Sequence, residues 1–193
     1  MTGLLEVRRV RLDDPLTEPL VRELTHEYVT RYGPSGADEM TRFPAAEFAP
    51  PDGTLLLLLT DGQPLAGGAY RRHGPGTAEV KRMWTHSAHR RRGLARRVLA
   101  ELEAEAARTG YRRMYLTTGP RQPEAAALYL ASGWTPLFDP AAVPTAGPLP
   151  FEKHLPAPDH LPAPDHPLAP DHPLALDHSP ASDHHLPGKA HTP

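Results

Sequence analysis

Residues 79–110 constrain the fold most strongly, because they combine a short apolar segment, a run of arginines and a long amphipathic segment. The pattern predicts a strand over residues 78–85, a loop over residues 87–92, and a helix that begins near Gly93 and ends before Gly110. Apolar residues recur along the helix at every fourth position, so one face can pack on a sheet. These residues are Leu94, Val98, Leu102 and Ala106, and Ala95 and Leu99 widen the face.

Arginines gather where this helix begins. The first N–H groups of a helix have no internal partner and lie at the positive end of its dipole. A glycine at this point allows a ligand to approach the backbone, and a phosphate or pyrophosphate is the simplest ligand for such a place. The alternative is a basic helix start that is only solvated. The surrounding arginines are Arg90, Arg91, Arg92, Arg96 and Arg97.

The segment RRRGLA at residues 90–95 fits the pattern Q/R-x-x-G-x-G/A, and this part of the chain resembles the GNAT superfamily of acetyl-CoA-dependent N-acetyltransferases. Later segments extend the resemblance in the same order: QPEAAALY at residues 122–129, SGW at residues 132–134 and FEK at residues 151–153. The resemblance covers residues 4–155 and implies that the arginine segment holds the pyrophosphate of coenzyme A. Arg90 stands where the family often has Gln, and Ala95 stands where it often has a second Gly.

The resemblance also implies which residues bind acetyl-CoA, the expected cosubstrate, and it requires no metal. The preceding strand is expected to offer its backbone to the pantetheine arm, and the helix start is expected to hold the phosphates. The cofactor-binding candidates are Met83, Trp84, Thr85, Arg90, Arg91, Arg92, Gly93, Leu94, Ala95 and Arg96. His86 and His89 have no third ligand nearby, so they are not interpreted as a metal site.

Two residues are candidates for the catalytic roles. The resemblance places Tyr129 near the sulfur of the cofactor, where it is expected to protonate the leaving thiolate; the alternative is an aromatic packed in the core. Glu79 is the candidate base, because a partly buried carboxylate has a raised pKa and can accept a proton. The alternative for Glu79 is a strand carboxylate paired with Lys81 or Arg82.

The rest of the chain gives the order of the other elements. A first strand is expected over residues 4–12, followed by a helix that Asp13 or Asp14 caps and that ends near Arg31. A polar connection over residues 38–53 precedes strands at residues 54–60 and 64–72, joined by a tight turn at residues 61–62. The order predicts an α/β fold with a mixed, mostly antiparallel sheet and helices on both faces. The resemblance adds a central parallel strand pair, residues 78–85 and 111–118, that splays apart to admit the cofactor.

The composition changes at residue 156. Residues 156–193 hold five Asp and one Lys, a net charge of −4, so the rest of this chain of net charge −2 carries +2. From Leu155, five hexads end in Asp-His, and their high Pro content predicts an extended chain without a core. We therefore expect a folded domain over residues 1–155 and a disordered tail over residues 156–193. Weak binding of Zn²⁺ or Ni²⁺ by the tail is the alternative to a repeat without a role.

The leading interpretation is an N-acetyltransferase that moves an acetyl group from acetyl-CoA to a primary amine, with a small molecule favoured, by direct attack in a ternary complex. The alternatives are transfer to a protein or peptide amine, and a CoA-binding sensing module with little turnover. Twelve Arg within residues 71–121 suggest nucleic-acid binding, but they cluster at one helix start without interleaved aromatics, so no nucleic-acid partner is expected. The absence of Cys and of any long apolar run favours a cytoplasmic enzyme without a membrane partner. The family resemblance allows a homodimer.

Overall fold

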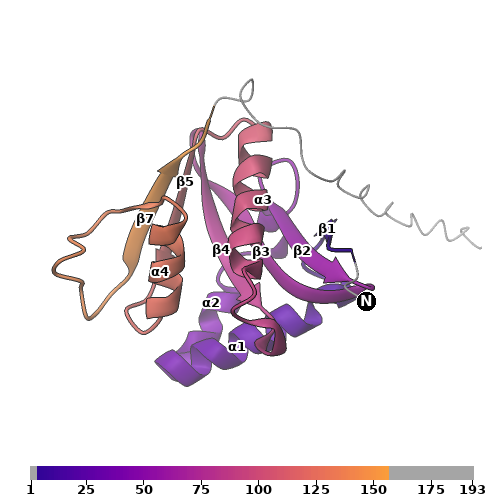
Figure 1. Ribbon diagram of the computed structural model, residues 1–193, viewed down its shortest axis with the longest axis horizontal. Helices are drawn as coiled ribbons and strands as arrows, with labels where there is room; N and C mark the ends of the chain where they lie inside the picture. The colour runs from indigo at the N-terminus through magenta and orange to yellow at the C-terminus, as the bar shows by residue number, and fades with distance from the viewer. Residues whose placement is uncertain (1–3, 157–193) are drawn as a thin grey trace, which may run out of the picture.

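The computed structural model describes residues 4–156, which form a seven-stranded sheet in the order β1-β2-β3-β4-β5-β7-β6 (Figure 1). Its strands are β1 (Glu6–Val10), β2 (Thr54–Thr60), β3 (Gln63–Gly74), β4 (Thr77–Thr85), β5 (Arg113–Thr118), β6 (Thr135–Pro136) and β7 (Leu149–His154). The helices are α1 (Glu18–Tyr32), α2 (Asp38–Thr41), α3 (Leu94–Arg108) and α4 (Pro123–Ala131). Short 3₁₀ turns occupy Pro15–Thr17, Pro34–Ala37, Ala45–Phe48 and Ser87–His89.

The sheet is antiparallel except between β4 and β5, which run parallel. These two strands pair only at their beginnings, where Glu79 opposes Tyr115 in the last matched position. Beyond this position β4 continues to Thr85 without β5 beside it. The backbone groups of β4 that face this gap therefore have no strand partner there. The predicted fold class and the predicted splay of the parallel pair are both confirmed.

Each face of the sheet has its own core, as alternating side chains on a strand require. Leu56 and Leu58 of β2 pack with the apolar face of α3 and with Tyr129 of α4. Leu55, Leu57 and Leu59 point to the other face. There they pack with Leu20 and Leu24 of α1. A run of five leucines that is buried on both faces thus fixes β2 as an inner strand with helices on both sides (Figure 1).

Most predicted elements lie where the sequence places them, and the differences have local causes. The sequence predicts an irregular connection over residues 38–53, but these residues contain α2 and a 3₁₀ turn. Two acidic residues in the first turn of α2 suit the positive end of a helix, and Met40 buries its side chain against α1. Asp14 caps the 3₁₀ turn before α1 by accepting from the backbone N–H of Leu16 at 2.8 Å.

The predicted tail lies outside the described residues, apart from Pro156, so its disorder and its weak metal binding stay predictions. Leu155 is the last buried residue described, and its backbone N–H donates to the carbonyl of Arg112 at 2.9 Å. A chain that ends after Leu155 keeps these contacts, so we expect it to unfold within about 3 °C of the full chain. Thermal unfolding followed by circular dichroism measures this difference.

A matched control truncates the chain before Leu149. This variant loses β7 and the fully buried Phe151, so it should not fold cooperatively. If the chain that ends after Leu155 also failed to fold, the predicted domain boundary would be wrong.

Candidate active site

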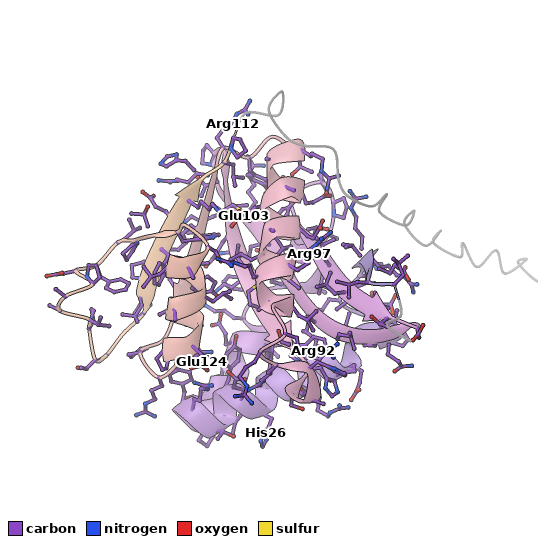
Figure 2. All side chains as sticks on the ribbon, in the orientation of Figure 1. His26, Arg92, Arg97, Glu103, Arg112 and Glu124 are labelled. Carbon is purple, nitrogen blue, oxygen red and sulfur yellow. The ribbon has the colours of Figure 1, made fainter. Side chains whose placement is uncertain are left out.

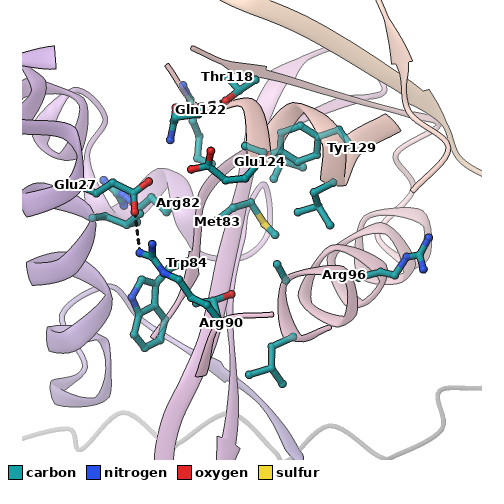
Figure 3. A pocket seen from close by; sticks show the side chains of 18 of the residues that line it. Glu27, Arg82, Met83, Trp84, Arg90, Arg96, Thr118, Gln122, Glu124 and Tyr129 are labelled. Carbon is teal, nitrogen blue, oxygen red and sulfur yellow. Dashed lines mark hydrogen bonds and ion pairs between the residues drawn. The ribbon is translucent and has the colours of Figure 1, made fainter. Parts of the chain in front are cut away.

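The gap between β4 and β5 opens into a cleft of about 410 Å³ (Figure 3). Five parts of the chain line it. They are the C-terminal half of α1, Glu39 of α2, the second half of β4, the first turn of α3 with the arginines before it, and α4 together with the end of β5. We call residues Arg90–Gly93 the arginine loop. The cleft thus lies where the predicted strand, loop and helix meet.

All of the predicted cofactor-binding residues except Arg92 line this cleft. Arg92 is exposed, and its guanidinium contacts Nδ1 of His89 at 2.8 Å. It lies near the lower end of α3, whereas Arg112 lies near the opposite end of the helix (Figure 2). Arg92 therefore belongs to the arginine loop without facing the cleft.

The backbone of the arginine loop leaves open space at the start of α3. Gly93 has φ +77° and precedes the first residue of the helix, and no atom lies within 4 Å of the position that a Cβ would occupy. Arg91 also has a positive φ, +61°, lines the cleft, and makes no hydrogen bond or ion pair with any residue from 4 to 156. The first turn of α3 contains no acidic residue. Free N–H groups, an uncommitted guanidinium and open space together fit a phosphate group.

Ion pairs connect α1 to the walls opposite it. Glu27 accepts from Arg90 of the arginine loop at 2.9 Å, the contact drawn as a dashed line in Figure 3, and from Arg31 at 3.3 Å. Arg31 in turn pairs with Glu124 at the start of α4. These contacts hold α1 against both the loop and α4 on one side of the cleft.

Tyr129 lines the cleft from α4, and its ring packs against Trp134 and Phe151. Burial raises the pKa of this phenol well above its ordinary value, so the hydroxyl stays protonated. Among residues 4–156 no hydrogen-bond partner is found for the hydroxyl. A protonated, uncommitted hydroxyl at the wall of the cleft can donate a proton to a bound molecule. The catalytic role of Tyr129 stays a prediction.

Glu79 lies before the point where the strands diverge and does not line the cleft. It is only 6% exposed, and both of its carboxylate oxygens are held in ion pairs. Arg71 donates to Oε2 from Nη2 at 2.8 Å, and Lys81 lies 3.3 Å from Oε1. Lys81 also contacts Glu39, which does line the cleft, at 2.8 Å. The predicted role of Glu79 as the base therefore requires a relay through Lys81 or water.

This placement gives a testable expectation for Glu79→Gln. Because the substitution removes the buried carboxylate that Arg71 and Lys81 share, and each keeps one more exposed partner, Glu47 and Glu39, we expect the free energy of unfolding to fall by about 2 kcal/mol. We expect kcat to fall less than about tenfold, whereas loss of a direct base lowers kcat by about 100-fold or more. Urea unfolding and steady-state kinetics on the same preparation separate the two effects.

The matched control for this prediction is Glu18→Gln, which removes an exposed partner of Arg22 and should change stability by less than about 1 kcal/mol. A Glu79→Gln protein that is as stable as the parent but nearly inactive would support the direct catalytic role instead.

A β-bulge turns two neighbouring residues of β4 toward α1 and α2. The register between β3 and β4 shifts around Gly68, and Arg82 has φ +57°. Lys81 and Arg82 consequently both reach α2: Lys81 contacts Glu39, and Arg82 donates from Nη2 to the carbonyl of Met40 at 2.8 Å. A side chain at Gly68 would clash with Met83 of β4 and with α3, because an added Cβ would lie 2.8 Å from the sulfur of Met83. The pair Gly67-Gly68 in the sequence predicts such a close approach.

Several cleft residues were missed by sequence reasoning. On α1 they are Leu24, Glu27 and Tyr28, whose spacing of three and four places them on one helix face. The others are Glu39 of α2, Val80, Lys81 and Arg82 of β4, Thr117 and Thr118 of β5, and Glu124, Ala125 and Leu128 of α4. The α1 residues stand in no motif, because a helix face that lines a cleft has the same pattern as one that packs on a core. Glu124 lies in the segment at residues 122–129, but nothing in the sequence assigns it a role in the site.

A cleft between diverging parallel strands, with a basic helix start at its mouth, defines an acyltransferase that uses an acyl-CoA donor. The chain belongs to the acetyltransferase (GNAT) family, whose pattern matches residues 18–134. No protein with a curated description matches the chain.

Solved structures of acetyltransferases share the fold. The GNAT domain of PAT from S. lividans is 25% identical, with a TM-score of 0.57 over 77% of this chain and 89% of that chain. An acetyltransferase from Thermus thermophilus is 21% identical, with a TM-score of 0.60 over 80% of this chain and 100% of that chain. The PaiA N-acetyltransferase from Thermoplasma acidophilum, solved in complex with coenzyme A, is 14% identical, with a TM-score of 0.58 over 78% of this chain and 99% of that chain.

Two kinds of feature are absent from residues 4–156. No helix in this range is both long and apolar enough to cross a membrane. Nor does the described part of the chain bring three His, Cys, Asp or Glu side chains together in a group that could hold a metal ion.

Proposed function

We propose that the protein is an N-acetyltransferase that moves the acetyl group of acetyl-CoA to the primary amine of a small molecule, by direct attack in a ternary complex. The observation that carries the proposal is the cleft at the splay of β4 and β5. The basic, open start of α3 lies at one end of this cleft, and the protonated hydroxyl of Tyr129 lies in its wall. The part of β4 that has no strand partner lines the cleft between them. Membership of the GNAT family supports an acyl-CoA donor.

Each wall of the cleft has a separate task in this proposal. The arginine loop and the first turn of α3 bind the pyrophosphate through backbone N–H groups and Arg91. The edge of β4 beyond Glu79 hydrogen-bonds the amides of the pantetheine arm, and the buried hydroxyl of Thr85, which has no partner among the described residues, lies on the same wall. Holding the thioester in one position supplies much of the rate enhancement.

The transfer forms one bond and breaks another. The amine nitrogen attacks the carbonyl carbon of the thioester, so a C–N bond forms and the C–S bond breaks. The thiolate takes a proton from the hydroxyl of Tyr129, and the amine loses one to a base. We propose Glu39 as the direct acceptor of that proton, because its carboxylate lines the cleft on the side of α1 and α2. Glu79 acts in this scheme only through Lys81, which contacts both carboxylates.

The experiment that tests the function is release of free thiol from acetyl-CoA across a panel of small amines, polyamines, amino acids and peptides. Release that depends on one class of small amine supports the proposal. Release with peptides alone supports a protein or peptide amine as the acceptor. Tight binding of CoA without release from any acceptor supports a sensing module. A cytoplasmic location and a homodimer stay predictions.

A further inference from the structure

The side of the cleft formed by α1 and α2 contains a buried cation that no carboxylate of the described chain contacts, although the charge of Glu39 acts on it from beyond ion-pair distance. Arg82 is only 5% exposed, yet no carboxylate among residues 4–156 lies within ion-pair distance of it. One of its terminal nitrogens, Nη2, donates to the carbonyl of Met40, and the guanidinium lies 4.0 Å from the centre of the Phe48 ring. The other terminal nitrogen, Nη1, is buried and has no hydrogen-bond partner in the described chain. Buried charges are normally paired, so this arrangement is unusual.

The neighbouring lysine does not share this property. Lys81 is partly buried, but Glu39 and Glu79 neutralise it at 2.8 Å and 3.3 Å. Arg71, the next cation on this face, pairs with Glu79 and Glu47. Among the described residues around the bulge, Arg82 is therefore the one buried cation with unused hydrogen-bonding capacity. Burial also lowers the pKa of its guanidinium, which reports the same loss of solvation.

The position of Arg82 connects it to the place where the acceptor must bind. Arg82 lines the main cleft, and Figure 3 shows it on the α1 side, across from Tyr129 and α4. It also lines a side cavity of about 10 Å³, whose wall includes Tyr28, Glu39 and Phe48. A cavity of this size has room for about one water-sized group. A single carboxylate oxygen fits it.

We infer that Arg82 recognises a carboxylate on the acceptor, so that the substrates are small amines that also carry a carboxylate, such as free amino acids. The inference rests on the proposed function and names its substrate class. The planar guanidinium matches a carboxylate and is already oriented by Phe48 and by the carbonyl of Met40. Glu39, which lines both the cleft and the side cavity, attracts the ammonium group of the same molecule. A zwitterion thus places its carboxylate at the unpaired guanidinium and its ammonium beside Glu39, whereas a simple amine makes only the second contact.

The test compares amino acids with their carboxamides as acceptors at saturating acetyl-CoA. A hydrogen bond to a charged group is worth about 10- to 100-fold in affinity. We therefore expect kcat/KM of the parent protein to favour the acid over the amide by about that factor. In Arg82→Gln we expect the acid-to-amide ratio to fall by about 10- to 100-fold relative to the parent, since the charge is lost. Arg72→Gln, an exposed arginine of β3 outside the cleft, is the matched control and should keep the parent ratio.

The ratio separates recognition from structural damage. If the substitution only loosens packing against Phe48, turnover of the acid and of the amide falls by the same factor. The amines of the two substrates differ in basicity, but this difference is the same for every variant, so it does not affect the change in the acid-to-amide ratio. Arg82→Lys keeps the charge but not the planar fork, so it should retain only part of the preference. A parent protein that accepts both substrates equally would overturn the inference while leaving acetyl transfer intact. An Arg82→Gln protein with the full preference would also overturn it.

Calorimetry keeps the inference testable if no amine is acetylated. With CoA at saturation, the N-acetylated amino acid should bind the parent protein at least about tenfold more tightly than its amide, and Arg82→Gln should lose the difference. Binding without turnover would support the carboxylate site and reject the proposed reaction. Equal binding of acid and amide, or no binding of either, would reject the carboxylate site.

Discussion

Gly93→Asp should weaken binding of acetyl-CoA by about 100-fold while leaving the protein folded. No atom lies within 4 Å of the new Cβ, so the side chain enters the open space at the start of α3 rather than the core. There its carboxylate faces the place proposed for the pyrophosphate. Two unit charges about 4 Å apart near a protein surface repel by about 4 kcal/mol before screening by salt, so a 100-fold loss is a moderate expectation. Isothermal titration calorimetry with acetyl-CoA measures the change.

The control for this prediction is Gly93→Asn, which has nearly the same shape without the charge. Asn and Asp both tolerate a left-handed backbone better than other side chains, so the cost of φ +77° is similar in the two variants. The difference between them therefore reports the electrostatic effect. We expect Gly93→Asn to weaken binding by less than about tenfold. Equal affinities of the two variants would show that no phosphate lies at the start of α3.

The sequence predicts those elements that depend on the spacing of nearby residues. The strand, arginine loop and helix at residues 79–110 follow from apolar spacing and from a glycine before the helix, and the structure places them as expected. β2 follows from its run of leucines. The splay of β4 and β5 came from the family resemblance rather than from spacing, because the point where two strands separate depends on tertiary packing.

The acceptor side of the cleft could not be predicted in the same way. Glu39 and Arg82 are far apart in the sequence, and nothing in the sequence assigns either of them a role in the site. They line the same side of the cleft because a bulge in β4 turns Lys81 and Arg82 to the same face and because Met40 anchors α2 there. For Glu79 the difficulty is that its sequence context fits two roles. A carboxylate at the start of a central strand fits a base or an ion-pair partner equally well, and only the positions of Arg71 and Lys81 distinguish them.

Tyr129→Phe should lower kcat by about 10- to 100-fold, with the affinity for acetyl-CoA changed less than about threefold. General acid catalysis contributes about 100-fold or more when the leaving group is poor, and a thiolate is a fair leaving group, so the lower part of the range applies. The hydroxyl has no partner among residues 4–156, so its removal breaks no structural hydrogen bond there. The ring keeps its contacts with Trp134 and Phe151. Steady-state kinetics at saturating acceptor and calorimetry with acetyl-CoA give the two quantities.

The matched control is Tyr115→Phe, which removes a phenol that stacks on His73 outside the cleft and should leave kcat within about twofold of the parent value. The pH profile adds a second criterion. Because burial raises the pKa of Tyr129, the acid stays protonated on the alkaline side, and it should cause no loss of turnover up to about pH 9. A proton donor whose pKa lay near its ordinary value would begin to deprotonate there. If Tyr129→Phe retains the parent kcat, the ring acts only in packing, and the thiolate must take its proton from water.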